Sequence, residues 1–289
     1  MIPASFDYHA PGTLPEALAL LSKYGDDAKV LSGGQSLLPL LKLRLGQTGH
    51  LIDIGRIPGL EYIREEGGLL RIGGRTRESA LEGSEVIRSR YPILHDTAKV
   101  IADPLVRNMA TLGGNLAHGD PGNDHPATML ALGAQVVATG PKGERVIPIE
   151  QFFLGLFRTA LRPDEVLTEI RIPVPPARSG GAYLKLERKV GDYATAAAAQ
   201  VTLGSGGAIE RVGLALTNVG PTPVKAVDAE KFLVGKKPDA ATLGEAAQRA
   251  AKAASPSADR RGSVEYKREM ARVLATRALK LAVERAGGR

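Results

Sequence analysis

The chain has 289 residues, of which 43% are hydrophobic, and it carries 38 Lys and Arg against 31 Asp and Glu and no cysteine. This composition suits a folded protein of two or three subdomains, and it excludes a disulfide framework, a thiolate nucleophile and a cysteine-ligated zinc or iron–sulfur cluster within these residues. The scattered basic residues argue against nucleic-acid binding, and with no apolar run of about eighteen residues and no signal-peptide pattern we expect no membrane span and a cytoplasmic location.

The N-terminal third alternates helical and extended patterns. Residues 15–24 are predicted to form a helix, since Pro15 suits a first turn and Leu18 and Leu21 repeat at helical spacing. A short apolar strand over 28–31 runs into a glycine loop at 32–36, and a helical pattern follows over 37–45. Residues 50–54 and 69–72 are predicted strands. The glycine loop is therefore expected at a strand–loop–helix junction.

The middle of the chain contains a second glycine-rich segment. Residues 84–101 are mainly helical in pattern, and 108–115 contain too much Gly and Asn for us to expect the interior of an element there. A strand is predicted over 135–139. Three prolines within 172–176 remove amide donors, so we expect no central strand or helix there and place a domain boundary at this point.

The remaining residues predict a second sheet and two helices. Alternating segments at 183–186, 195–203 and 212–219 predict a small antiparallel sheet, and 241–254 and 264–286 predict helices. The expected class is α+β, with subdomains at 1–55 and 56–177 followed by a sheet-plus-helices domain at 178–289.

Two glycine pairs are the strongest chemical signal. Gly33-Gly34 and Gly113-Gly114 are each flanked by hydroxyl residues, a composition that lets backbone amides approach a polyanion such as a pyrophosphate. Either pair alone is more often an ordinary tight turn. Neither fits the GxGxxG or GxxxxGK[ST] nucleotide motifs.

Other polar and aromatic residues allow alternatives. His118 and His125, with acidic neighbours, suggest a metal site, but a histidine in a polar turn is more often a surface hydrogen-bonding group. Tyr193 precedes an alanine-rich strand and is placed to stack on a planar ring or to pack in the core. The charged stretch at 258–272 is interpreted as the start of a helix that is solvated or contacts another subunit. No side chain is assigned as a general acid or base.

Two longer segments carry a resemblance to a known family. KVLSGGQSLLPLLKLR at 29–44 and IADPLVRNMATLGGNLAHGDPGNDHPA at 101–127 resemble the two FAD loops of the molybdenum hydroxylase flavoproteins, and the likeness continues over essentially the whole chain. The family patterns AGGHS and TIGGN differ from this chain at Ser32, Gln35 and Leu112, which spares the glycines. Within the family, the chain is most similar to the medium subunits of aerobic carbon monoxide dehydrogenases.

The resemblance implies a two-subdomain PCMH-type FAD-binding fold, followed by a C-terminal antiparallel sheet with helices, and it implies a set of FAD-contacting positions. Two glycine loops hold the pyrophosphate and adjoining groups, Asp124 hydrogen-bonds nearby, and Tyr193 covers the isoalloxazine. The complete set is Lys29, Val30, Leu31, Ser32, Gly33, Gly34, Gln35, Ser36, Ile101, Ala102, Thr111, Leu112, Gly113, Gly114, Asn115, Asp124, Leu161, Lys185 and Tyr193.

The resemblance further implies an electron-relay role in a complex. A large molybdenum-cofactor subunit oxidises the substrate, a small subunit carries two [2Fe-2S] clusters, and FAD on this chain passes electrons to an external acceptor, in a dimer of heterotrimers that is cytoplasmic or associated with the inner face of the membrane. Carbon monoxide is the expected substrate. An aldehyde, a purine or another N-heterocycle is the alternative, and a non-catalytic nucleotide-binding module is a third interpretation.

Overall fold

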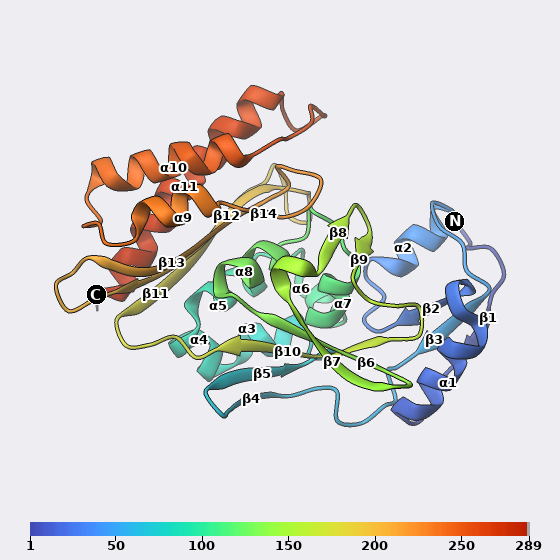
Figure 1. Ribbon diagram of the computed structural model, residues 1–289. Helices are drawn as coiled ribbons and strands as arrows, with labels where there is room; N and C mark the ends of the chain where they lie inside the picture. Colours follow the sequence, from blue (N-terminus) through green and yellow to red (C-terminus); the bar gives the residue numbers. More distant parts are fainter. Residues whose placement is uncertain (288–289) are drawn as a thin grey trace.

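The N-terminal part of the protein is a small parallel sheet with helices. The structure is a computed structural model, and it describes residues 1–287 (Figure 1). Strands β1 (Asp7–His9), β3 (His50–Asp53) and β2 (Ala28–Leu31) pair in that order. Helix α1 (Leu14–Tyr24) begins with a capping box between Thr13 and Glu16 and buries Leu18 and Leu21. The 3₁₀ turn η1 (Gly25–Asp27) precedes β2, and α2 (Leu37–Lys42) follows the first glycine loop.

The middle part is a five-stranded antiparallel sheet with short helices. Its strand order is β4-β5-β10-β6-β7, so β10 is central. The strands are β4 (Ile63–Glu66), β5 (Leu69–Gly73), β6 (Gln135–Gly140), β7 (Gly143–Pro148) and β10 (Val166–Pro173). The helices between β5 and β6 are α3 (Glu78–Gly83), α4 (Glu85–Arg90), α5 (Pro92–Lys99), α6 (Pro104–Arg107), α7 (Leu112–Ala117) and α8 (His125–Leu132). The turn η2 (Ile149–Gln151) leads into a two-stranded hairpin, β8 (Phe153–Gly155) and β9 (Arg158–Thr159).

The C-terminal part is an antiparallel sheet covered on both faces. Strands β11 (Ser179–Leu186), β12 (Thr195–Leu203), β13 (Ile209–Thr217) and β14 (Val224–Lys225) pair in chain order, and α9 (Val227–Leu233), α10 (Ala240–Ala253) and α11 (Val264–Ala286) follow. The side chains of β12 alternate between two cores: Ala196 and Ala198 join the core of the middle part, whereas Ala197 and Ala199 face the core of the terminal helices. Small residues on both faces therefore let helices approach this sheet closely.

Helix α8 joins the middle and C-terminal parts. Every residue from His125 to Leu132 is buried. A Cβ built on Gly213 of β13 would lie 1.9 Å from the carbonyl oxygen of Ala131 in α8, so only glycine permits this approach. On the opposite face, a Cβ on Gly180 would lie 2.3 Å from the carbonyl oxygen of Ala282 in α11. The C-terminal sheet is thus clamped between α8 and α11.

The α+β class and the C-terminal antiparallel sheet with helices are confirmed, and two local expectations are wrong. Gly113 and Gly114 lie inside helix α7, because Thr111 caps that helix by accepting a hydrogen bond from the amide of Gly114. Ile172 and Pro173 belong to the central strand β10. Proline is tolerated there because it is the last residue of the strand, opposite Leu69. The division at 55/56 and 177/178 stays a proposal. It leaves the three-stranded sheet in the first part, the five-stranded sheet and the β8-β9 hairpin in the second, and the four-stranded sheet in the third.

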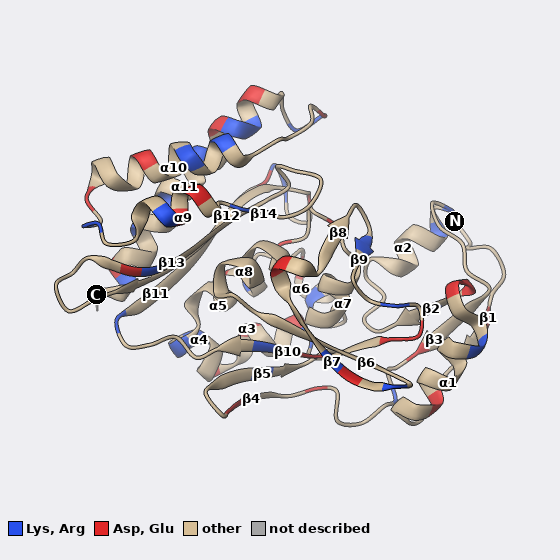
Figure 2. Ribbon diagram, viewed as in Figure 1, with Lys and Arg blue, Asp and Glu red and all other residues tan. Residues whose placement is uncertain are grey.

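Charged side chains are distributed over the whole ribbon. Figure 2 shows blue and red segments interspersed along α10 and α11, where Arg249 pairs with Glu245 and Asp228, and Arg272 pairs with Glu269. No helix within residues 1–287 is both long and apolar enough to cross a bilayer.

Candidate functional site

The first glycine loop follows β2 and offers free backbone donors. Within residues 1–287, the amides of Gly33, Gly34 and Gln35 donate no hydrogen bond to other protein groups. Gly34 has a φ of 73°, a conformation that L side chains rarely adopt. Three consecutive free amides in a loop with one left-handed residue form the kind of concave nest that binds phosphate oxygens.

The second glycine segment is held by the chain that follows β5. The amide of Gly113 donates to the carbonyl of Gly74, the amide of Leu112 donates to Thr76, and the amide of Glu78 donates to Ala110, each at 3.0 Å. A Cβ on Gly113 would lie 2.4 Å from the carbonyl oxygen of Gly74. Gly113 is therefore required for packing against the sheet, and the amides of this segment are already used inside the protein, unlike those of the first loop.

The first glycine loop touches the N-terminal cap of α7, with 79 positions between the two contacting residues. The hydroxyls of Ser32 and Thr111 are 3.0 Å apart and share a hydrogen bond. A Cβ on Gly33 would lie 2.2 Å from the carbonyl oxygen of Met109. Asn115, one turn into α7, has a buried side-chain oxygen with no partner among the described residues. The segment that contacts the first glycine loop thus carries an unpaired buried acceptor, which suits a polar ligand.

A buried polar group lies at the start of α8. The carboxylate of Asp124 accepts hydrogen bonds from the Tyr183 hydroxyl at 2.5 Å and from the Lys185 ammonium at 3.0 Å. Lys185 also donates to the carbonyl of Val100 at 3.0 Å. Burial and the neighbouring Asp124 carboxylate raise the pKa of Tyr183 well above its ordinary value, so the phenol remains a donor. Asn123 donates to the carbonyl of Asn115 and so connects this group to α7.

Tyr193 lies on the loop between β11 and β12 and is held at several points. Its hydroxyl donates to Asp120 at 2.5 Å, and its ring is close enough to Gly122 that a Cβ there would lie 2.6 Å from it. The Arg261 guanidinium lies 5.2 Å from the ring centroid. Burial and the hydrogen bond to Asp120 raise the pKa of Tyr193, yet 45% of the residue is exposed. An exposed, fixed and neutral aromatic side chain is available to a planar ligand.

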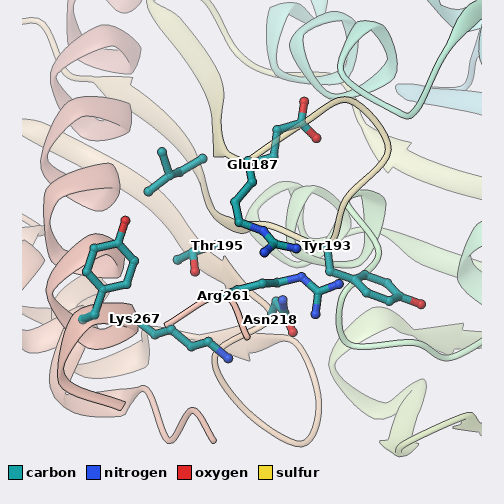
Figure 3. A pocket seen from close by; sticks show the side chains of 9 residues that line it. Glu187, Tyr193, Thr195, Asn218, Arg261 and Lys267 are labelled. Carbon is teal, nitrogen blue, oxygen red and sulfur yellow. The ribbon is translucent and has the colours of Figure 1, made fainter. Parts of the chain in front are cut away.

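A small cavity lies behind Tyr193. Figure 3 shows Arg261 reaching toward Tyr193, with Thr195, Asn218 and Lys267 around the cavity. Its volume is about 80 Å³, which is well below the several hundred Å³ of ordinary cofactor pockets. Asp192 bridges Arg261 and Arg188, and these hydrogen bonds lower its pKa to about 2. These ion pairs hold the Tyr193 loop, and the cavity is too small for a flavin ring.

Comparison with known proteins identifies the family. A family model described as "FAD binding domain in molybdopterin dehydrogenase" matches residues 4–175, and one described as "CO dehydrogenase flavoprotein C-terminal domain" matches residues 181–282. The chain belongs to this molybdopterin dehydrogenase FAD-binding family. The carbon monoxide dehydrogenase medium chain of Afipia carboxidovorans is 48% identical over 99% of both chains.

Solved structures agree with the family assignment over the full length. A structure of carbon monoxide dehydrogenase from Hydrogenophaga pseudoflava superposes with a TM-score of 0.96 at 48% identity, covering 99% of each chain. Quinoline 2-oxidoreductase from Pseudomonas putida 86 superposes with a TM-score of 0.92 at 33% identity, again over 99% of each chain. The fold of this flavoprotein is therefore shared by relatives named for different substrates.

The residues of this flavoprotein fit a dinucleotide cofactor. The free amides of Gly33, Gly34 and Gln35 suit pyrophosphate oxygens, and the unpartnered oxygen of Asn115 suits a hydroxyl or amine donor. The exposed ring of Tyr193 suits a flavin face. Donors, an acceptor and an aromatic surface thus occur in one chain, as FAD requires.

The family-implied positions differ in how closely the structure brings them together. Ser32 with Thr111, and Lys185 with Asp124, are in direct contact, and Tyr193 is tied to Asp120. Lys29, Val30 and Leu31 lie in β2, Ser36 precedes α2, and Leu112 is fully buried, so Leu112 presents no side chain to a ligand. Ile101 and Ala102 form a turn whose carbonyls accept from Arg107, with Ala102 at a φ of 44°. Leu161 follows β9 and packs against the core of the middle part.

Several features were missed by sequence reasoning or interpreted wrongly. His125 is not a surface group, since it is fully buried and lies 2.7 Å from Glu78. No group of three or more His, Cys, Asp or Glu side chains in residues 1–287 is arranged to hold a metal ion. Arg261 contacts Tyr193 and Lys267 is buried, so the 258–272 stretch is not simply a solvated helix start. The bonds of Asp120 to Tyr193 and of Tyr183 to Asp124 gave no sequence signal, because their partners are 73 and 59 positions away.

Proposed function

We propose that this flavoprotein is the FAD subunit of a carbon monoxide-oxidising molybdenum complex and passes electrons from the iron–sulfur clusters of a partner to an external acceptor. The observation that carries the proposal is the full-length similarity to a carbon monoxide dehydrogenase medium chain at 48% identity. The touching glycine loops of the structure support the flavin role independently.

The proposed FAD contacts divide into three groups. The amides of Gly33, Gly34 and Gln35 bind the pyrophosphate, and Ser32 and Thr111 set the spacing of the two loops. The other proposed contacts are Lys29, Val30, Leu31, Ser36, Ile101, Ala102, Leu112, Gly113, Gly114, Asn115, Asp124, Leu161, Lys185 and Tyr193. For Gly113, Gly114 and Leu112, the geometry favours a role in the shape of the segment, since their amides are donated inside the protein.

The chain controls the orientation and surroundings of the cofactor. When bound, FAD supplies the redox chemistry, accepting and releasing electrons singly or in pairs. Tyr193 stays protonated, because burial and Asp120 raise its pKa, and it presents a neutral ring. Lys185 holds Asp124 in one rotamer from β11 and fixes the carbonyl of Val100 at the same time. These residues bind FAD or position the groups around it, and none of them is required to transfer a proton.

The proposed partners rest on the similarity to carbon monoxide dehydrogenase medium chains, and the absence of cysteine agrees with them. With no cysteine, the chain has no thiolate ligand for a [2Fe-2S] cluster. We place the clusters on a small iron–sulfur subunit and the molybdenum cofactor on a large subunit, in a dimer of heterotrimers. We further propose a cytoplasmic location, with the complex associating with the inner face of the membrane.

The substrate is tested on the assembled complex. The chain is co-expressed with its partner subunits, purified by a tag on this chain, and supplied with carbon monoxide, aldehydes, purines and N-heterocycles in the presence of a dye acceptor. Dye reduction by carbon monoxide alone supports the proposal. Reduction by another substrate class transfers the same flavin role to a different hydroxylase, in keeping with the similarity to quinoline 2-oxidoreductase. A colourless complex that reduces no dye favours a non-catalytic nucleotide-binding module.

A further inference from the structure

A buried pair of polar side chains lies behind the flavin site, outside the contacts assigned above. Glu78 is the first residue of α3 and His125 is the first residue of α8. Both side chains are fully buried, and Glu78 Oε2 lies 2.7 Å from His125 Nε2. The two atoms share one hydrogen bond in the interior of the protein.

Stability alone does not explain this pair. The second oxygen of Glu78 and the second ring nitrogen of His125 are both buried and have no partner among the described residues. Unsatisfied buried polar atoms lower stability, and apolar residues of similar volume often replace a buried ion pair without loss. The pair therefore needs a role other than holding the core together.

Each residue of the pair is linked to a different side of the proposed flavin site. The amide of Glu78 donates to Ala110, immediately before Thr111, the residue whose hydroxyl meets Ser32. His125 follows Asp124, which carries the bonds to Tyr183 and Lys185. The side-chain bond between Glu78 and His125 closes a continuous path from the second glycine segment to Asp124.

We propose that Glu78 and His125 are a positioning pair that sets the separation between the Thr111 segment and Asp124, and thereby the affinity for FAD. This inference rests on the proposed FAD function. A hydrogen bond between two fully buried groups is directional and short, so it fixes the relative placement of α3 and α8 more tightly than apolar contact does. Neither residue is proposed to contact FAD.

The test uses the complex purified with its partner subunits, in four variants of this chain: Glu78→Leu, His125→Leu, the double Leu variant, and Glu78→Gln. FAD dissociation constants, thermal midpoints and the visible circular dichroism of the bound flavin are measured. Each single Leu variant loses the hydrogen bond between the two side chains, and we expect it to bind FAD about tenfold more weakly.

The double variant separates positioning from stability. We expect it to recover most of the thermal midpoint, because no unpaired polar group remains, while FAD still binds about tenfold more weakly with an altered flavin dichroism. Glu78→Gln keeps an acceptor for His125 and is expected to bind FAD as the wild type does. A double variant with wild-type FAD affinity and dichroism, or a Glu78→Gln variant as weak as Glu78→Leu, overturns the proposal.

Amide hydrogen exchange covers the case in which the double variant does not fold. In the complex carrying Glu78→Leu, exchange is expected to accelerate in residues 110–115 and to stay unchanged in β12, at 195–203. Equal acceleration in both segments indicates a global loss of stability and refutes positioning. A wild-type complex without FAD refutes the proposed function instead, so the two failures are distinguishable.

Discussion

Replacing Gly33 by Ala tests whether the two glycine loops must touch. The added Cβ would lie 2.2 Å from the carbonyl oxygen of Met109 and 2.8 Å from the Cα of Ala110, both rigid backbone atoms. To reach ordinary van der Waals separation, the loops must move apart by about 1 Å. The contact between Ser32 and Thr111 would then lengthen from 3.0 Å to about 4 Å, too long for a hydrogen bond.

The magnitude follows from these two effects. Overpacking of this kind costs about 1–3 kcal/mol, and the lost hydroxyl bond contributes about 1 kcal/mol more. A loss of about 3 kcal/mol in the free energy of unfolding lowers the midpoint by on the order of 6 °C in a chain of this size. Calorimetry gives the midpoint, and the flavin absorbance of the purified complex gives the accompanying loss of FAD.

Gly244→Ala is the matched control. Gly244 lies inside α10, and a Cβ there meets no atom within 4 Å. Because alanine is the better helix former, this substitution is expected to stabilise the protein by about 0.5–1 kcal/mol. A Gly33→Ala variant that keeps its midpoint and a full complement of FAD would contradict the claim that the loops must meet.

Three further predictions concern other parts of the molecule. Lys185→Met removes the buried partner of the Asp124 carboxylate and is expected to lower the free energy of unfolding by about 3–5 kcal/mol. The control is Lys189→Met, at an exposed position, and equal effects of the two substitutions in denaturant titrations would refute the burial argument. Burial lowers the pKa of His118 in the folded protein below 6.5, so the unfolded chain binds the proton at higher pH and the free energy of unfolding falls as the pH decreases from 6.5 toward the pKa of the folded protein. His118→Gln should reduce this dependence of the free energy of unfolding on pH, and an unchanged dependence would count against the argument. Gly213→Ala, with its Cβ 1.9 Å from α8 backbone, should lose about 2 kcal/mol or more, whereas Gly206→Ala, which meets nothing within 4 Å, should keep its midpoint.

Elements with local signals were predictable from the sequence. The start of α1 was indicated by Pro15 and the apolar spacing of Leu18 and Leu21, and the structure adds the capping box at Thr13. The alternation of β12 and the long pattern of α11 likewise matched what formed. In each case the stabilising contact lies within a few residues or on one face of the element, so the sequence pattern reflects it directly.

The failures have one local and two distant causes. The helix at Gly113 and Gly114 was missed although its cap, Thr111, is a local signal, whereas the contact that requires glycine at 113 is with the distant Gly74. His125 is buried because its side chain forms a hydrogen bond with Glu78, which lies 47 positions away in the sequence. Nothing near Gly113 or His125 in the sequence indicates that Gly74 and Glu78 lie beside them. The glycine loops were found by composition, but their contact through Ser32 is a property of the fold alone.

The central claim is that this chain carries the flavin through which electrons leave the complex. The most direct measurement is anaerobic addition of carbon monoxide to the purified complex, with FAD quantified per chain and the flavin absorbance followed. The account predicts one FAD for each copy of this chain and loss of oxidised-flavin absorbance that air or a dye restores. A complex that oxidises carbon monoxide at full rate but contains no flavin, or whose flavin stays oxidised throughout, would contradict it.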